Sequence, residues 1–307
     1  MKKHYSTLLF VSFFQVFGLW SQEVQIFKVE DFDLKGKVKS CLVITDYGRE
    51  LFEFNTEGVL TRTVTQYNDQ DQDITDYKYE NGELVEKRME SYKNNVLDES
   101  TSMANFYTID TVPTRKVVEK IISYDKQFLE REEYQYDESG KLVRIISSNV
   151  DGVDETTFEY TPYKNELTIS TFTNSILEKS VRTSEKKTSK GTQKIVLTKE
   201  YVDGEPNTAV EEVFHPDGNL FTREEFLYDV GEKEFVSQKK LFHHYKDGVL
   251  DKVTTKTLNT ESVDEFIFQF DSHNPKNWVK QIVTPDNTYT TRVIKYYPED
   301  SKEETNR

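Results

Sequence analysis

The stretch Glu133-Tyr134-Gln135-Tyr136-Asp137-Glu138-Ser139-Gly140-Lys141-Leu142-Val143-Arg144-Ile145-Ile146 decides the fold class of this chain. Its two tyrosines are separated by one residue and therefore share one face of an extended strand. The aspartate can accept hydrogen bonds from backbone N–H groups that follow it, and the glycine tolerates the positive φ of a tight turn. The aliphatic residues after the turn are typical of a returning strand. The stretch therefore predicts a β-hairpin with aromatic side chains on one face.

The same pattern recurs along the chain. Aromatic-x-aromatic pairs occur at Phe52/Phe54, Tyr77/Tyr79, Tyr134/Tyr136, Phe158/Tyr160, Phe226/Tyr228 and Phe268/Phe270. Several aromatic residues are followed by a turn and a leucine, namely Leu60, Leu84, Leu220 and Leu250. Turns arrive about every 12 to 14 residues, which leaves little room for a helix between strands. The sequence predicts an all-β fold, an antiparallel β-hairpin repeat array that forms an extended, curved or partly closed meander sheet.

The run from Tyr134 to Leu142 resembles the tyrosine-aspartate (YD) repeat of bacterial rearrangement-hotspot (RHS) proteins. Phe268-Gln269-Phe270-Asp271, followed by Asn277-Trp278-Val279-Lys280, is similar to a variant of this repeat in small exported bacterial proteins. The resemblance covers roughly two-thirds of the chain, from about Lys37 to about Tyr297, and it implies architecture rather than activity. Large relatives use such repeats to enclose a toxin domain. This chain shows no appended toxin domain, so that role is not carried over.

The first residues have the features of an export signal. Lys2 and Lys3 precede an apolar run from Leu8 to Trp20, and Ser21 is a small residue before the expected cut. This pattern predicts a signal peptide over residues 1–21, with an uncleaved anchor as the alternative. The expected cut has no cysteine, so a lipoprotein is not expected. We expect a periplasmic or extracellular protein without a membrane span after cleavage.

The rest of the chain is expected to form one β-repeat domain over residues 22–298, followed by a disordered tail over 299–307. The repeat pattern weakens at about 98–118, where either an irregular insertion or a strand pair with long loops would fit. It weakens again at about 168–200, a segment rich in Thr, Ser and Lys. This second interruption could divide two halves of the array, but the sequence does not favour two independent domains.

The composition predicts a folded acidic protein. Charged residues make up 31% of the chain, yet aromatic residues reach 13%, which is too high for a disordered acidic chain. The formal net charge is −15, and removal of residues 1–21 takes away lysines but no acids. Nucleic acids and anionic membrane surfaces are therefore not expected as partners, because both bind basic patches.

One segment has the spacing of a calcium loop. Asp69, Asp71, Asp73 and Glu80 fall on loop positions 1, 3, 5 and 12. However, Ile74 stands where the sharp turn of such a loop needs glycine, and no flanking helices are predicted. A solvated acidic hairpin tip is the simpler interpretation. No other cofactor is expected.

The sequence offers no catalytic motif. Cys41 is the single cysteine and lies among apolar residues, so we expect a small buried side chain rather than a nucleophile. His243 and His244 are adjacent and would face opposite sides of a strand, so they cannot share a metal directly. No HExxH motif, CxxC pair or nucleophile elbow is present.

Three hypotheses for function remain. The first is a non-enzymatic exported protein that binds a protein or glycan partner through an extended surface. The second is a polysaccharide hydrolase with paired carboxylates, although 55 acidic residues prevent the sequence from nominating a pair. The third is a structural protein stabilised by calcium. An exposed aromatic stripe would favour binding, whereas a deep pocket with two carboxylates would favour the enzyme.

Overall fold

A computed structural model describes residues 25–298, which form β-strands and one short 3-10 helix, η1 (Val29–Phe32). The first strands are β1 (Val38–Thr45), β2 (Gly48–Phe54), β3 (Leu60–Gln66), β4 (Gln72–Glu80), β5 (Glu83–Lys93), β6 (Val96–Leu97) and β7 (Met103–Asp110). They are followed by β8 (Lys116–Ser123), β9 (Phe128–Tyr136), β10 (Leu142–Asn149), β11 (Val153–Tyr163), β12 (Glu166–Thr173), β13 (Ile176–Thr188) and β14 (Gly191–Val202). The last are β15 (Glu205–Phe214), β16 (Leu220–Asp229), β17 (Glu234–Lys246), β18 (Val249–Thr257), β19 (Glu261–Phe270), β20 (Trp278–Thr284) and β21 (Thr288–Tyr296).

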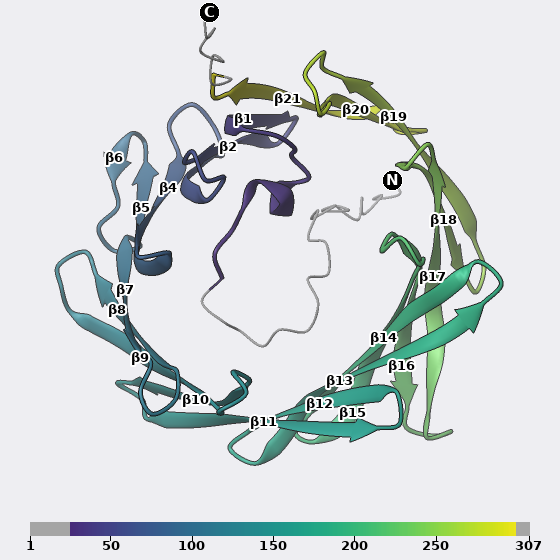
Figure 1. Ribbon diagram of the computed structural model, residues 1–307, viewed down its shortest axis with the longest axis horizontal. Helices are drawn as coiled ribbons and strands as arrows, with labels where there is room; N and C mark the ends of the chain where they lie inside the picture. Colours follow the sequence, from purple (N-terminus) through teal and green to yellow (C-terminus); the bar gives the residue numbers. More distant parts are fainter. Residues whose placement is uncertain (1–24, 299–307) are drawn as a thin grey trace, which may run out of the picture.

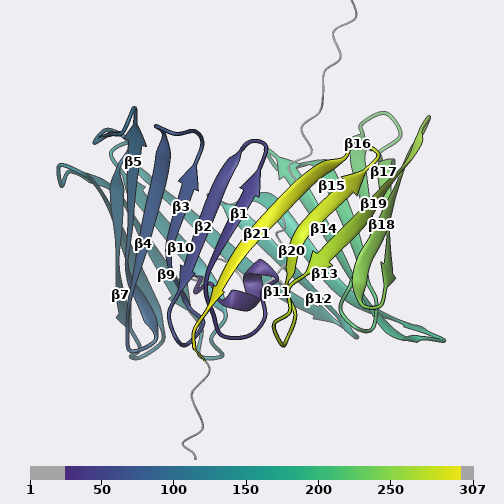
Figure 2. The ribbon, with the colours of Figure 1, turned by 90° about the horizontal axis from the view of Figure 1, so that it is seen from above.

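These strands form one antiparallel sheet that closes into a barrel (Figure 1). Each strand of the ring pairs with its neighbours in the chain, and the first strand, β1, also pairs with the last, β21. The two-residue strand β6 pairs with β5 outside the ring, so 20 strands make up the barrel itself. Figure 2 shows the strands inclined to the barrel axis, as closure of a sheet requires. The predicted all-β antiparallel array is confirmed, and its closure is complete.

The strand register assigns each residue of the wall to the lumen or to the outside. Helix η1 lies inside the barrel, and Cys41, Phe54 and Leu60 pack against it (Figure 1). Residues directly opposite each other in neighbouring strands share a face, so this lumen face can be followed strand by strand around the ring. Five of the six aromatic-x-aromatic pairs lie on it. Phe226/Tyr228 is the exception and lies on the outer face, because its neighbour Glu225 pairs with lumen-facing Lys239.

The hairpin motif explains how the wall curves. Tyr136 pairs with Leu142 and Gln135 with Arg144, so Val143 is an extra residue in its strand. The same bulge accompanies the motif leucines Leu60, Leu84, Leu220 and Leu250. Bulges bend the sheet and increase its twist, and they are common at barrel rims. The repeat therefore places one bend per motif hairpin at the same end of the barrel.

The turn of the opening hairpin has the predicted chemistry. The Asp137 carboxylate accepts hydrogen bonds from the backbone N–H groups of Ser139 (2.8 Å) and Lys141 (3.0 Å). Gly140 has φ +80°, a region that residues with a side chain rarely adopt. The motif tyrosines also join neighbouring hairpins, because the Tyr160 hydroxyl donates to the carbonyl oxygen of Leu142 (2.8 Å). Tyrosine at this position therefore has a structural role in the wall.

The segment before β1 is fastened inside the barrel by side chains of β20, β21 and the turn before β20. The Asn277 side chain accepts from the Lys35 N–H and donates to the Lys35 carbonyl, both at 2.8 Å. Trp278 Nε1 donates to Asp33 (2.8 Å), and the Arg292 guanidinium donates to the carbonyl oxygen of Phe32 (3.1 Å). Together with the apolar cluster around η1, these bonds attach the segment to the lumen face.

The two weak regions of the repeat are regular parts of the ring. Residues 98–118 contain β7 and the start of β8, so the strand-pair alternative is the one that the structure has. Residues 168–200 lie in β12, β13 and β14, which continue the ladder without a domain division. The expected signal peptide over 1–21 and the expected tail over 299–307 lie outside the described residues.

Candidate functional site

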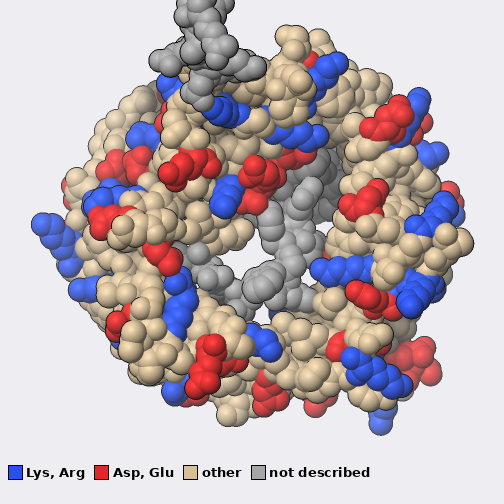
Figure 3. Space-filling view, in the orientation of Figure 1, with Lys and Arg blue, Asp and Glu red and all other residues tan. Residues whose placement is uncertain are grey.

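The outer wall carries charged side chains along the strands. Cross-strand ion pairs on this face join Arg62 to Asp76 (2.9 Å), Lys116 to Glu133 (3.0 Å) and Arg144 to Glu155 (2.6 Å). Side chains of both signs are also spread over the rim seen in Figure 3. Strands that face lipid present an apolar band instead. The strands that carry these ion pairs therefore suit contact with water. Separately, the segment 25–298 contains no helix long and apolar enough to cross a membrane.

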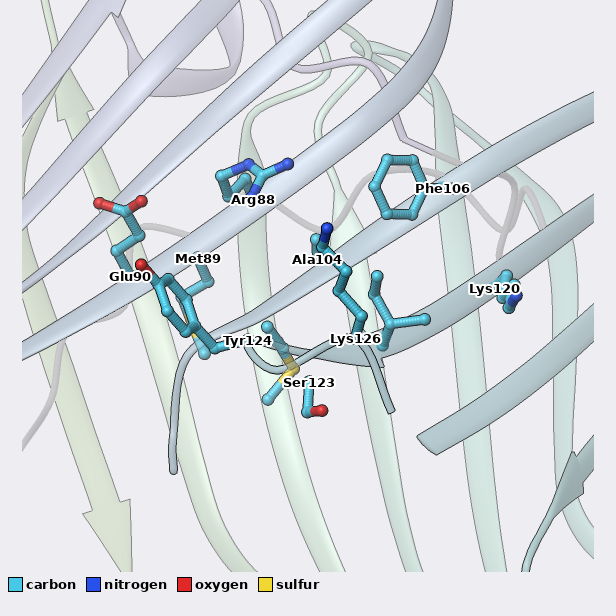
Figure 4. Close-up of a pocket in the computed structure, with 11 residues that line it drawn as sticks. Arg88, Met89, Glu90, Ala104, Phe106, Lys120, Ser123, Tyr124 and Lys126 are labelled. Carbon is cyan, nitrogen blue, oxygen red and sulfur yellow. The ribbon is translucent and has the colours of Figure 1, made fainter. Parts of the chain in front are cut away.

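A groove of about 370 Å³ lies on the outer wall where the sheet splits (Figure 4). Strand β5 pairs with β7 over residues 86–89, and beyond that point it pairs with β6. The small side chain of Ala104 forms the floor, since it stands opposite Arg88 on one side and Ile122 on the other. Phe106 and Ile122 add apolar walls. We call this feature the Ala104 groove.

The rim of the Ala104 groove is mainly cationic. Arg88 is held in place by Glu86, which accepts from Nε (3.0 Å) and Nη2 (2.6 Å). Lys120 and Lys126 take part in no ion pair within the described part of the chain. Figure 4 shows Glu90 and Tyr124 at one end of the groove and Phe106 and Lys120 at the other. An apolar floor below a cationic rim can bind apolar groups that carry or neighbour negative charge.

The lumen wall holds the paired carboxylates that the sequence could not nominate. Glu119 and Glu132 stand directly opposite each other on β8 and β9, and the Tyr134 hydroxyl reaches both. Glu119 is buried, and it also accepts from Asn105 (2.5 Å) and the Tyr107 hydroxyl (2.9 Å). Burial and the neighbouring carboxylates raise the pKa of both tyrosines, which therefore remain donors at neutral pH. These donors bind the carboxylates as parts of the wall rather than presenting them to a substrate.

The tyrosines of the wall predict that the protein loses stability at alkaline pH. Burial, together with the hydrogen bond to Asp271, raises the pKa of Tyr296 to about 12, above its ordinary value of 10.0. The folded protein then holds this proton more tightly than the unfolded chain, so the stabilisation is complete below pH 10 and lost as the pH rises towards 12. We expect the free energy of unfolding, measured by urea titration, to fall across this window. Tyr296→Phe should flatten the fall, whereas replacement of exposed Tyr47 by Phe should leave it unchanged.

The four predicted calcium ligands lie in two places. Asp69 and Asp71 are in the turn after β3, Asp73 is in the first part of β4, and Glu80 ends that strand. Seven residues of strand place Glu80 about 23 Å from Asp73. In residues 25–298, no group of three or more His, Cys, Asp and Glu side chains is arranged to hold a metal. Calcium binding at the Asp69 turn remains a prediction.

The carboxylates of this turn have protein donors. The Asp71 side chain accepts from Asn68 Nδ2 and from the Asn94 N–H, both at 2.8 Å. These hydrogen bonds lower the pKa of Asp71. Asp73 accepts from the Tyr67 hydroxyl (2.7 Å). The aspartates thus fasten the turn to the neighbouring hairpin, which the spacing of acids alone did not indicate.

The cysteine and the histidine pair behave as the sequence predicts. Cys41 is buried, and burial raises the pKa of its thiol to about 11, so the thiol is a poor nucleophile at neutral pH. His243 faces the lumen with lumen-facing Val253, and His244 faces outside. Burial lowers the pKa of His243, which favours the neutral ring.

Comparison with known proteins adds little to these observations. No family model matches the chain, and no curated protein matches it. A porin-like protein from Bacteroides uniformis is 9% identical, with 85% of this chain and 98% of the other covered and a TM-score of 0.33. A Tc holotoxin pore from Photorhabdus luminescens is 10% identical over 78% of this chain and 18% of the other, with a TM-score of 0.18. The TcdB2-TccC3 structure is 9% identical over 84% and 22%, with a TM-score of 0.16.

Proposed function

We propose that this chain is an exported, non-enzymatic binding protein that holds a protein partner against the outer wall of its barrel. The observation that carries the proposal is the Ala104 groove. It combines aromatic and arginine side chains, which are enriched at protein interfaces.

The charges at the groove define the partner further. Arg88, Lys120 and Lys126 surround the apolar floor, while Glu90 is the acid at the rim. The partner segment should therefore present an apolar side chain beside one or more acidic residues. This arrangement is typical of an interface hot spot, in which an apolar anchor fills a pocket and charged groups surround it.

The enzymatic alternative has weaker support. Glu119 and Glu132 are brought together, but they face the lumen and are bound by tyrosine and asparagine side chains of the wall. The Ala104 groove lies on the opposite face of the same sheet. Polysaccharide hydrolysis would need one carboxyl group free to donate a proton and the other free to attack or activate water.

Filling the groove provides the test. Ala104→Trp should abolish capture of a partner from the native exported fraction, because the indole occupies the space above the floor. Val293→Trp is the matched control, since Val293 is exposed on the outer face of β21. Capture is measured by cross-linking and mass spectrometry after both variants are shown to unfold at the same temperature as the parent. Equal capture by Ala104→Trp and the parent protein would exclude the groove.

A further inference from the structure

The outer wall from β13 to β18 has an unusual charge for this protein. Its outward-facing cations are Arg182, Lys186, Lys199, Lys240, Lys252 and Lys256, and its outward-facing acids are Glu211 and Glu224. The cations therefore outnumber the acids here, although the whole chain has a net charge of −15. Lys186, Lys199 and Lys252 join no ion pair of the described residues. This side of the barrel is suited to a negatively charged ligand.

Aromatic rings lie among these cations on the same face. They are Phe226 and Tyr228 of β16 and Phe235 and Phe242 of β17. The rings of Tyr228 and Phe235 meet edge to face, with centroids 5.2 Å apart. The ammonium groups of Lys199 and Lys240 lie 5.0 and 5.7 Å from the centroids of Phe235 and Phe242. Lys256 approaches Phe242 from the next strand, at 5.9 Å. We call these rings and lysines the aromatic-lysine patch.

The orientation of these rings is not explained by folding of the repeat. In the other five aromatic-x-aromatic pairs the rings face the lumen, where they pack against neighbouring hairpins. At β16 the lumen face instead carries Arg223, which binds Glu212 (2.7 Å) and Glu225 (3.2 Å). Charged groups thus occupy the lumen side and the aromatic pair is outside. The rings are half-buried, since Phe226 stands opposite buried Ala209 and Tyr228 packs on Phe235, and their remaining exposed surface is open to a stacking ligand.

From these observations we infer that the aromatic-lysine patch binds a carboxylated polysaccharide. Sugar rings present C–H groups that stack on aromatic faces. A uronic acid carboxylate can pair with Lys199, which joins no ion pair of the described residues, whereas Lys240 and Lys256 already pair with Glu224 (2.6 Å) and Glu261 (3.1 Å). The rings and ammonium groups, which lie on β14, β16, β17 and β18, fit a polymer that repeats both features. A single-stranded nucleic acid also offers stacking faces and negative charge, and the experiment below distinguishes it from the polysaccharide.

This site is separate from the Ala104 groove. Strands β5, β7 and β8 lie on one side of the ring, and β16 and β17 lie on the opposite side (Figure 1). A protein partner and a polysaccharide can therefore be bound at the same time. The inferred polysaccharide site does not depend on the proposed protein partner, so an experiment can exclude either site without excluding the other.

The experiment is affinity electrophoresis of the full chain in gels that contain polygalacturonate, with dextran as the neutral polymer. We expect retardation by polygalacturonate and none by dextran, and the retardation should weaken as salt is raised. Phe242→Ala and Lys199→Gln should each weaken the apparent affinity about tenfold. Tyr289→Ala is the matched control, because this outward tyrosine of β21 also has a lysine over its ring, with Lys280 Nζ 5.1 Å away.

Three results would overturn the inference. The first is absence of retardation at low salt for the parent protein. The second is equal weakening by Tyr289→Ala and Phe242→Ala, since binding would then not be located at the patch. The third is stronger retardation by a single-stranded oligonucleotide than by polygalacturonate. The melting temperatures of all variants are measured first, so that loss of fold is not mistaken for loss of binding.

Discussion

Replacing Arg292 with alanine is expected to lower the free energy of unfolding by about 3 to 5 kcal/mol. Arg292 is buried on the lumen face of β21, where it donates to the carbonyl oxygens of Phe32 (3.1 Å) and Asp33 (3.2 Å). Its guanidinium also stacks on Trp278, with the central carbon 3.5 Å from the ring centroid. Alanine would leave two partly buried acceptors without their donor and a gap beside the indole. Loss of a donor to a buried acceptor costs about 1 to 3 kcal/mol by itself.

Urea unfolding followed by tryptophan fluorescence measures this change, because Trp278 is one of two tryptophans in the chain. Arg182→Ala is the control, since Arg182 lies half-exposed on the outer wall and its nearest carboxylate is 3.9 Å away. That variant should change the stability by less than about 1 kcal/mol. An Arg292→Ala protein as stable as the control would contradict a role of Arg292 in fastening the segment before β1 to the barrel.

Leu142→Ala is expected to cost about 2 to 5 kcal/mol of unfolding free energy. Leu142 is the motif leucine of the central hairpin and is 1% exposed, in the cluster with Val117, Tyr134 and Ile145. Removing its branched side chain would leave a cavity that the surrounding strands cannot collapse into, because each is held in a ladder on both sides. The adjacent hairpin is also affected, since Tyr160 donates to the Leu142 carbonyl.

The comparison for this variant is Leu227→Ala. Leu227 is on the lumen face of β16 but is 50% exposed, so its truncation should cost less than about 1 kcal/mol. Both variants are measured by urea titration at the same pH, and the slope of the unfolding transition is compared to detect partial unfolding. Similar losses for the two leucines would contradict a core located at the motif hairpins.

The hairpin class could be predicted from sequence because its causes are local. Side-chain alternation in Tyr134/Tyr136, the Asp137 turn and the positive φ of Gly140 all depend on residues within one hairpin. Closure of the ring could not be predicted in this way, because it depends on β1 meeting β21, more than 240 residues later. The partners of Asn277 and Trp278 lie at a similar separation, so the Asn-Trp pair was visible but its contact with Asp33 and Lys35 was not.

Candidate sites could not be located from the sequence, because the sequence does not show whether a side chain faces the lumen or the outside. The aromatic pair Phe226/Tyr228 is identical in pattern to the five lumen-facing pairs, and only the register of the neighbouring strands shows that it is outside. The Ala104 groove depends on the split between β6 and β7, in a region where the repeat is weak. The match of Asp69 to Glu80 with a calcium loop rested on their separation along the chain. In the structure, the extended strand β4 places Glu80 far from the aspartates.

The pairing of β1 with β21 has a consequence for the order in which the barrel assembles. Every other contact of the ladder joins strands that are near in sequence, so hairpins can form one after another with small losses of chain entropy. The final contact must bring the two ends of a nearly complete sheet together, and it removes both edges at once. An interrupted assembly would expose two unpaired strands that can join another copy of the chain, whereas the completed ring has none. Ring closure therefore protects the protein against strand-mediated aggregation.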